Sequence, residues 1–500
     1  MMLRLAVAWI ACTAALATAA PVPDFSALER RAAQEVDSGN LPSLAVAVVR
    51  DGEIVYARAF GHADLAQRRP ATVHTAYALA SATKPITATA VMQLAERGKI
   101  DLAAPARRYL GPLRLRAADP AWPAPSVAQL LDHTAGLATY AHIYFGDAVA
   151  RAPAFARSVE RFGVLVQPPG RVAEYSNLGY GLLGDIVERR GGAGFGDYLA
   201  REVFAPLGMT DAFVDTPQPG ADVATPYDAQ NAALPALRND TPGAGNVQAS
   251  AHDLVRFARF HLDPASAEKP VLSTAGVRRM QQRADAKALH HYYAGAYYGL
   301  GWYVRPDDGG ERAVWHEGGM PGASSIIKLL PERRIGVVVL ANKSEVNAVT
   351  QAVADDALRA LLPGYAPGPL DATANYARYA AQPDFLGEWR GSVTVGGRKL
   401  ACELRFGDGK IALALAASDD TTRRARGEFA GIVYGDSFVG AVPMALPIAE
   451  QSGAGSPLLL VKLVRSGDVL QGAFVAYASP QRLEYLLPFA VRMTRTRRWP

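Results

Sequence analysis

Apolar runs near the start of the chain predict a pair of strands. Residues 44–50 and 53–58 are rich in small and branched apolar side chains, and the pair Asp51-Gly52 separates them. An Asp-Gly pair between two such runs is typical of a β-hairpin. Residues 325–330 and 335–341 have the same character and predict a second hairpin.

Between and after these hairpins the apolar residues follow a helical spacing. One stripe runs over residues 86–94, with Ser81 at the predicted start of the helix and Gly98 at its end. Residues 25–36 and 347–362 show the same spacing. Because strands at both ends enclose these helices, we expect one sheet that is completed by segments far apart in the sequence.

The chain is predicted to divide at residues 362–370, a segment rich in proline and glycine. We assign residues 20–362 to an α/β (α+β) domain and residues 363–382 to a linker. Beyond residue 383, short strand-like runs alternate with glycine-containing turns, which is typical of a small sandwich or a lipocalin-like barrel. Residues 383–500 are therefore expected to form a separate all-β domain that supports binding or solubility rather than bond cleavage.

Composition excludes several classes of protein. Of the 500 residues, 50% are hydrophobic and 20% are charged, which excludes a disordered chain. The net charge is only +5, from 52 basic and 47 acidic side chains, so nucleic-acid binding has no support. The sequence has no Cys-x-x-Cys pair and no second histidine at zincin spacing after His316. We therefore expect neither a metal nor a cofactor.

Residues 1–19 have the features of a cleavable secretory signal. Arg4 supplies a positive charge, an apolar run follows, and small residues surround the cleavage point after Ala19. The mature protein is therefore expected to be periplasmic or secreted. No later segment has the length of a transmembrane helix. Cys402 is then the remaining cysteine, so no internal disulfide is expected, and the oligomeric state is left open.

Three Ser-x-x-Lys matches are candidates for a nucleophile with its base, because residues i and i+3 are neighbours on a helix. They begin at Ser81, Ser266 and Ser325. Ser325 lies in a predicted strand, where i and i+3 point to opposite faces, and Ser266 lies in a polar segment between two prolines. Ser81 and Lys84 stand at the start of an apolar helix, where the helix dipole favours a nucleophile and a lowered lysine pKa.

Two further motifs, each present once, complete a pattern. Residues 175–177 (Tyr-Ser-Asn) open an apolar helical run, and residues 316–319 (His-Glu-Gly-Gly) precede the second hairpin. Together with Ser81 and Lys84, in this order, they resemble the serine β-lactamase and penicillin-binding superfamily. The sequence is most similar to the branch that contains class C β-lactamases, D-alanyl-D-alanine carboxypeptidases, D-aminopeptidases and family VIII esterase-like hydrolases, over about residues 25–362.

The resemblance implies a β-lactamase-like fold, with an antiparallel sheet flanked by helices and an all-helical region. It also implies an acyl-enzyme mechanism. Ser81 would attack a carbonyl, and Lys84 and Tyr175 would carry its proton. Asn177 would orient Lys84 and the substrate, and His316 would position Tyr175 or the substrate.

The resemblance assigns further residues to substrate binding. The backbone N–H groups of Ser81 and Gly319 would form the oxyanion hole. Gly318 completes the His-x-Gly pattern of the third motif. Glu317 and Asn342 are the remaining candidates for contact with the substrate.

Two departures from the family pattern bear on the substrate. Glu317 stands where carboxylate-binding relatives carry a hydroxyl residue, and Thr350 stands where class C β-lactamases usually carry an arginine. A carboxylate at position 317 repels an anionic substrate if it faces the site. In the alternative arrangement Glu317 points to solvent and pairs with an arginine, because neighbouring residues of a strand face opposite sides.

These residues favour an exported serine hydrolase that acts on a small-molecule or peptide substrate, including one derived from the cell wall. A D-amino-acid peptidase or an esterase fits best. A class C-like β-lactamase is one alternative, and a catalytically inactive binding protein with the penicillin-binding fold is another. A further interpretation makes the C-terminal β-domain a binding module or a cap over the site.

Overall fold

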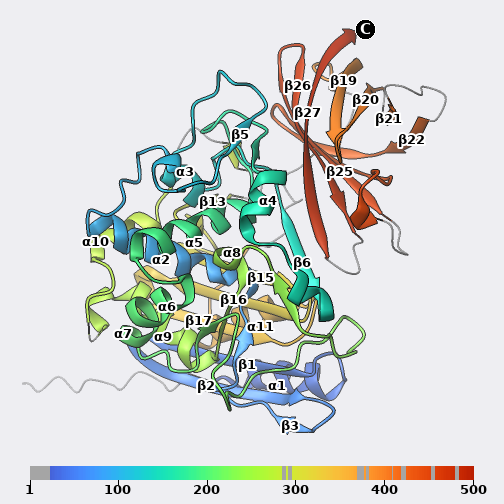
Figure 1. Cartoon of the computed structure of the whole chain (residues 1–500). Coiled ribbons are helices and arrows are strands. Elements are labelled where there is room, and N and C mark those ends of the chain that lie inside the picture. Colours follow the sequence, from blue (N-terminus) through green and yellow to red (C-terminus); the bar gives the residue numbers. More distant parts are fainter. Residues whose placement is uncertain are drawn as a thin grey trace, which may run out of the picture.

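The structure is a computed structural model of the 500-residue chain. It describes residues 23–267, 269–283, 289–290, 295–368, 377–378, 382–407, 409–417, 424–451, 457–478 and 484–499. The predicted signal at residues 1–19 lies outside the described residues, as does much of the predicted linker. A mixed helix-and-sheet part is followed by a β-barrel part at the C-terminal end (Figure 1).

The first part is built on an eight-stranded antiparallel sheet. Its strands, in spatial order, are β13 (Tyr297–Tyr298), β14 (Tyr303–Arg305), β15 (Ala313–Met320), β16 (Ala323–Leu330), β17 (Ile335–Ala341), β1 (Ser43–Arg50), β2 (Glu53–Asp64) and β3 (Arg69–Pro70). Both predicted hairpins are present, as β1–β2 and β16–β17. β1 also pairs with β17, for example Val46 with Val339, so distant segments complete one sheet as expected.

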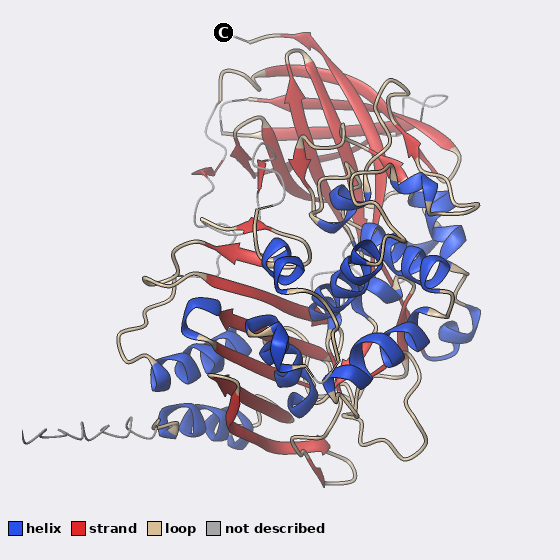
Figure 2. Ribbon diagram, turned by 90° about the vertical axis from the view of Figure 1, so that its left-hand side faces the viewer, coloured by secondary structure: helices blue, strands red, loops and turns tan. Residues whose placement is uncertain are grey.

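Helices cover both faces of this sheet (Figure 2). Val46 and Val48 of β1 pack with α1 (Ser26–Asp37) and α11 (Asn347–Leu361), whereas Ala45 and Ala47 pack with α2 (Thr83–Glu96) and α9 (Ala251–Leu262). Successive side chains of a strand point to opposite faces. A strand that is covered on both faces has to be apolar throughout, which explains the continuous apolar run of β1.

Helix α2 is the centre of the helical region. A short turn, η1 (Ala80–Ala82), leads into it, and every residue from Thr83 to Leu94 is buried. Helices α5 (Asn177–Gly191) and α8 (Pro242–Gly245) pack against it. The predicted helix is confirmed, and Ser81 lies in the turn that opens it.

The C-terminal part is one antiparallel sheet that curves into a nearly closed barrel (Figure 1). Its strands, in spatial order, are β18 (Ala377–Arg378), β23 (Gly431–Tyr434), β24 (Ser437–Pro443), β25 (Leu458–Ser466), β26 (Val469–Tyr477), β27 (Tyr485–Arg497), β19 (Gly387–Val395), β20 (Arg398–Phe406), β21 (Ile411–Ala417) and β22 (Arg424–Phe429). Of the two predicted architectures, a sandwich and a barrel, the structure therefore has the barrel. No helix in the described part of the chain combines the length and the apolar character that a membrane span needs.

The barrel is docked against the first part through a shared strand pairing. β6 (Ala141–Phe145) pairs with β27, with Ala141 opposite Leu486 and His142 opposite Tyr485. A small apolar cluster seals the same contact and consists of Ala138, Val166, Ala473 and Val475. The two parts therefore share backbone hydrogen bonds as well as side-chain packing.

A buried charge cluster ties the sheet to α11. Lys328 Nζ lies 2.9 Å from Asp308 Oδ2 and 3.2 Å from Asp355 Oδ1. Arg305 donates to the other oxygen of Asp308 at 2.7 Å. Lys328, Asp308 and Arg305 are buried, so each charge depends on its partners for solvation.

We expect Lys328→Met to lower the free energy of unfolding by about 3 to 5 kcal/mol, because it leaves buried carboxylates without their shared cation. Urea denaturation measures this loss. Lys410→Met is the control, since Lys410 is 81% exposed in its side chain and meets Glu428 only at 3.8 Å. A loss below about 1 kcal/mol in Lys328→Met would contradict the assignment.

Candidate active site

Ser81 is presented by a turn that is held from two sides. It lies in η1 directly before α2 and is partly exposed, while Ala80 before it has a positive φ of 47°. Such a backbone conformation is uncommon for a residue with a Cβ and persists only when the surroundings impose it. Here Ser325 Oγ on β16 donates to the Leu79 carbonyl at 2.7 Å, and the Leu79 N–H donates to the Val247 carbonyl. The turn is therefore fixed to the sheet on one side and to β11 (Val247–Ala249) on the other.

Lys84 points from the first turn of α2 back toward Ser81. Its Nζ lies 3.0 Å from Ser81 Oγ, 2.7 Å from Asn177 Oδ1 and 2.9 Å from the Ala244 carbonyl oxygen. Asn177 in turn donates from Nδ2 to the Tyr140 carbonyl at 2.8 Å. The helices α2, α5 and α8 thus converge on one amine, and all three of its hydrogen-bond partners are uncharged.

Burial lowers the pKa of Lys84 well below its usual value. A neutral amine has two N–H donors and one lone pair, which matches two carbonyl-type acceptors and one hydroxyl. The Nζ also lies 4.6 Å from the ring centroid of Tyr175, and this contact favours the charged form by about 1 kcal/mol. Desolvation of the buried amine is the larger of the two effects, so the pKa of Lys84 stays lowered.

Tyr175 precedes α5, at whose start Ser176 caps the helix by accepting from the Gly179 N–H at 3.3 Å. Burial raises the pKa of Tyr175 well above its ordinary value, the Glu317 carboxylate raises it further, and a hydrogen bond to Ser81 opposes both effects. The Tyr175 phenol is therefore protonated at neutral pH. The structure brings Ser81, Lys84, Tyr175 and Asn177 together at one point.

His316 lies on β15, and both of its ring nitrogens have protein partners. Nδ1 is 2.6 Å from the Glu317 carbonyl oxygen, and Nε2 is 2.8 Å from the Tyr298 hydroxyl. A carbonyl can only accept, so Nδ1 carries the proton and Nε2 accepts from Tyr298. Burial lowers the pKa of His316 to about 3. The neutral ring lies in an aromatic cluster with Tyr175, at 6.3 Å between the ring centroids, and its role in positioning Tyr175 or the substrate stays a prediction.

The two glycines of the third motif have different surroundings. A Cβ on Gly318 would overlap the Leu79 carbonyl oxygen, whereas a Cβ on Gly319 would lie 3.1 Å from Asn347 Oδ1. Asn347 Nδ2 donates to the Gly318 carbonyl at 2.9 Å. Gly318 therefore allows β15 to approach the Ser81 turn, and Asn347 holds the motif from the opposite side.

Glu317 and Asn342 are the remaining predicted site residues. The Glu317 carboxylate lies close enough to Tyr175 to add to the rise of its pKa, of which burial is the main cause. The structure corrects the expectation for Asn342, which is buried. Its Oδ1 accepts from Ser43, and its Nδ2 donates to the Thr225 carbonyl at 3.0 Å. Its amide holds β17 to neighbouring segments, and Asn347 is the asparagine that contacts the third motif.

The Ser325 match is separated from its lysine as the sequence predicts. Ser325 Oγ contacts Leu79 on the α2 side of the sheet, whereas Lys328 contacts Asp355 of α11 on the other side. The two side chains face opposite surfaces of β16, so they do not form a nucleophile and base. Ser266 lies in the short turn η5 (Pro264–Ser266), not at the start of an apolar helix.

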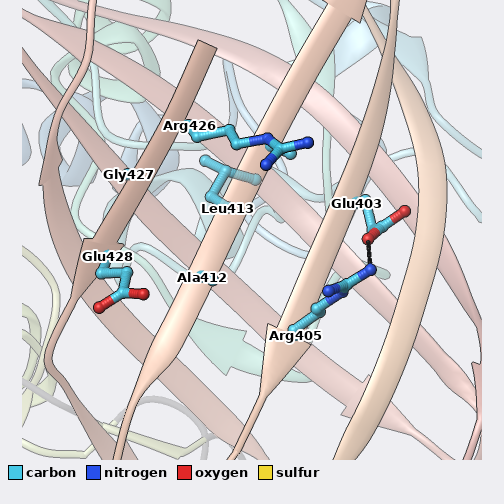
Figure 3. A pocket seen from close by; sticks show the side chains of 8 residues that line it. Glu403, Arg405, Ala412, Leu413, Arg426, Gly427 and Glu428 are labelled. Carbon is cyan, nitrogen blue, oxygen red and sulfur yellow. Dashed lines mark ion pairs between the residues drawn. The ribbon is translucent and has the colours of Figure 1, made fainter. Parts of the chain in front are cut away.

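A hollow of about 310 Å³ lies on the outer face of β20, β21 and β22 (Figure 3). Small side chains of Ala412 and Ala414 form its floor, with Glu403 and Arg405 on one side. Glu403 and Arg405 pair with each other at 2.6 Å, which leaves their charges largely neutralised. The strands β20, β21 and β22 lie on the side of the barrel that is turned away from α2 (Figure 1).

Among the residues that the structure describes, one group has the composition of a metal site. His74, Asp211 and His252 each offer a ligand atom, and these atoms lie within 4.8 Å of one another. However, His74 Nδ1 already bonds Asp211 Oδ2 at 3.0 Å, and Arg256 lies 3.3 Å from His252 Nε2. A guanidinium in contact with a ligand opposes a divalent cation, so we assign no ion to this cluster.

The chain belongs to the Beta-lactamase family, whose profile matches residues 28–362. It is 27% identical over 318 residues to protein flp of Staphylococcus aureus strain N315, which covers 62% of this chain and 61% of that protein. It is 26% identical over 334 residues to penicillin-binding protein 4* of Bacillus subtilis strain 168, which covers 62% of this chain and 70% of that protein. The chain thus spans about three fifths of the length of the first curated relatives it matches.

Solved structures share the fold over nearly the whole chain. The octameric penicillin-binding protein homologue from Pyrococcus abyssi has a TM-score of 0.56 at 20% identity, covering 94% of this chain and 100% of that one. SurE with D-Leu has a TM-score of 0.64 at 22% identity, covering 94% and 99%. Coverage of this extent means that the shared fold includes most of the C-terminal barrel. The family is one of serine hydrolases and penicillin-binding proteins, and the fold is β-lactamase-like.

We expect Gly318→Ala to destabilise the protein by about 1 to 3 kcal/mol, because the new methyl group forces β15 away from the backbone of the Ser81 turn. Thermal unfolding measures the loss, and labelling of Ser81 by a fluorophosphonate probe should fall with it. Gly319→Ala is the matched control, since its methyl group meets only the Asn347 side chain, which can shift. Equal losses in both variants would contradict this account of Gly318.

Proposed function

We propose that the protein is a serine hydrolase that forms an acyl-enzyme at Ser81 and cleaves an amide or ester bond of a small-molecule or peptide substrate. One observation carries the proposal. Lys84 Nζ is fully buried, lies 3.0 Å from Ser81 Oγ, and has only uncharged hydrogen-bond partners. A buried amine with a depressed pKa is the base that a serine nucleophile needs at neutral pH.

The hydrogen-bond partners of Lys84 suggest how the proton moves in this proposal. The two N–H groups of neutral Lys84 donate to Asn177 and Ala244, so its lone pair faces the Ser81 hydroxyl. Lys84 then takes the hydroxyl proton as Ser81 Oγ attacks the substrate carbonyl. Tyr175 stays protonated and sits beside the same hydroxyl, so it is suited to hand a proton to the leaving group. Lys84 then passes the proton that it took from Ser81 to the Tyr175 phenolate, so both groups return to their starting protonation states. Water then cleaves the acyl-enzyme, with neutral Lys84 again as base, and the proton taken from water returns to Ser81 Oγ.

The third motif would stabilise the oxyanion. The N–H groups of Ser81 and Gly319 are the proposed donors, as the sequence resemblance implies. The close approach that Gly318 permits between β15 and Leu79 supports this role, because both donors must meet one oxygen. His316 contributes as a neutral ring that packs under Tyr175.

Two observations favour a D-amino-acid peptidase or an esterase within this class. The Glu317 charge acts on Tyr175, so a substrate carboxylate bound beside the phenol would meet a like charge. Thr350 is buried within α11 and bonds the Asn347 carbonyl at 3.0 Å, so no arginine is supplied there for an anionic substrate. The related fold of SurE was solved with D-Leu, which is consistent with recognition of a D-amino acid.

Two other functions are kept as alternatives. A class C-like β-lactamase would use the same Ser81 and Lys84, and it is disfavoured by the charge of Glu317. A catalytically inactive penicillin-binding-like protein would keep the fold, and it is disfavoured because Ser81, Lys84, Tyr175 and Asn177 are all present and in contact. Hydrolysis of nitrocefin identifies the first, and acylation without turnover identifies the second.

We expect Ser81→Ala to abolish covalent labelling by a fluorophosphonate probe. Lys84→Ala and Tyr175→Phe should each lower the acylation rate by about a hundredfold or more, because each removes one proton carrier. Intact-protein mass spectrometry gives the labelling, and stopped-flow measurements give the rates. Thermal unfolding shows whether each variant is folded. Labelling that persists in Ser81→Ala would refute the assigned nucleophile.

The pH dependence tests the same assignment. Lys84 acts as a base only when it is deprotonated, so acylation should rise with pH through its lowered pKa, well below the usual value for lysine. His316 has a pKa of about 3 and stays neutral over this range. In the plot of acylation rate against pH, His316→Gln should therefore leave the midpoint of the rise on the acid side unchanged. If that midpoint moves in His316→Gln, the rise on the acid side reports the titration of His316 instead of Lys84.

We expect Glu317→Gln to raise kcat/KM for substrates with a free carboxylate more than for neutral esters. Removal of a like charge a few ångströms away is worth about 1 to 4 kcal/mol, or roughly fivefold to several hundredfold. The comparison uses D-alanyl-D-alanine peptides against p-nitrophenyl esters at low and high salt, and the gain should shrink at high salt. Equal effects on both substrates would place Glu317 outside the substrate contact.

A further inference from the structure

A lysine of the barrel reaches into the first part of the chain beside the second motif. Lys462, on β25, lies with its Nζ 2.6 Å from Glu174 Oε1 and 2.8 Å from Thr139 Oγ1. Thr139 Oγ1 also donates to Glu174 Oε1 at 2.5 Å. The side chains of Lys462 and Glu174 are only 23% and 18% exposed. This is a charge-assisted cluster that solvent screens little.

Both partners of Lys462 are immediate neighbours of the proposed catalytic groups. Glu174 is followed by Tyr175, whose phenol lies at Ser81. Thr139 is followed by Tyr140, whose carbonyl accepts from Asn177 Nδ2 at 2.8 Å. Lys462 therefore clamps together the two backbone segments that set the position of Tyr175 and the orientation of Asn177.

The barrel, which carries Lys462, is held firmly against the first part of the chain. β27 pairs with β6 immediately after Tyr140, and Gln167 Nε2 donates to the Gln471 carbonyl at 2.6 Å. Because the barrel is docked, the position of Lys462 is fixed, whereas a long side chain on a free surface loses entropy when it forms an ion pair. The same interface holds a second ion pair, Arg161 with Glu450 at 2.8 Å, which touches neither motif.

We propose that Lys462 is a positioning residue for the second motif, and that the C-terminal barrel thereby completes the active site. This inference rests on the proposed function. It departs from the expectation that the barrel takes no part in bond cleavage. Without Lys462, the Glu174 carboxylate loses its cation next to Tyr175, and the segment that carries Tyr175 moves. Small displacements of a catalytic group cost about a hundredfold in rate, so the effect falls on kcat rather than on KM.

The test compares three variants of the full chain. Lys462→Met removes the charge at nearly constant length, Lys462→Arg keeps it, and Arg161→Met breaks the matched interdomain pair. We expect Lys462→Met to lower kcat for a p-nitrophenyl ester by at least about tenfold with little change in KM. Lys462→Arg should recover at least half of the decrease in log kcat. The kcat of Arg161→Met should stay within about twofold of the parent value.

Hydrogen exchange supplies a readout that does not need activity. Amides of residues 139–142 and 174–177 should exchange faster in Lys462→Met than in Arg161→Met, at temperatures where both are folded. Unchanged kcat and unchanged exchange in Lys462→Met would overturn the inference, as would equal changes in Arg161→Met. If the parent protein neither hydrolyses esters nor labels at Ser81, the proposed function fails, while the exchange data still decide whether Lys462 holds the motif.

Discussion

The burial of one amine is the constraint on which the rest of the structure depends. Lys84 is fully buried within α2, and an uncompensated ammonium in that position would be costly. The protein meets this cost with neutral acceptors from α5 and α8 and with a serine hydroxyl, rather than with a carboxylate. An ion pair would have fixed Lys84 in its charged form and removed the base. The uncharged surroundings therefore hold the lysine in place and leave its pKa lowered, as the proposed role of Lys84 as a base requires, and three helices have to meet at its tip to do so.

The sequence predicts those parts of the structure that depend on local pattern. Both hairpins, the helix that follows Ser81 and the choice among three Ser-x-x-Lys matches follow from apolar spacing and from the alternation of strand faces. The positions of His316 and Asn342 could not be predicted in this way. His316 is turned by the Tyr298 hydroxyl, and Asn342 is held by Ser43 and Thr225, all of them partners that only the tertiary fold brings near. The Lys462 to Glu174 contact, 288 residues apart in the chain, leaves no local signal at all.

The barrel and the catalytic part are less independent than a proline-rich boundary suggests. Their contact shares a strand pairing between β6 and β27, an apolar cluster and several polar links. Strand pairing is directional, so it fixes the register of the barrel against the segment that carries Tyr140. A side chain on β25 then arrives at a defined place beside the second motif. A linker sequence therefore marks where the chain changes from one folding pattern to another, and it does not show that the two parts act separately.

The charged side chains around Tyr175 connect the barrel contact with the proposed chemistry of the site. Two carboxylates flank it: Glu174 precedes it in the chain and Glu317 approaches from β15. Glu174 is held 2.6 Å from Lys462 and is directed toward the barrel, whereas the Glu317 charge adds to the rise of the Tyr175 pKa. A protonated phenol can give a proton to a leaving group, while a phenolate can only accept one. Burial is the main reason that Tyr175 stays protonated, and the Glu317 charge adds to the same effect. Under the proposed function, the protonated phenol therefore has two carboxylates near it, of which Lys462 neutralises Glu174 and leaves Glu317 to act on a bound substrate.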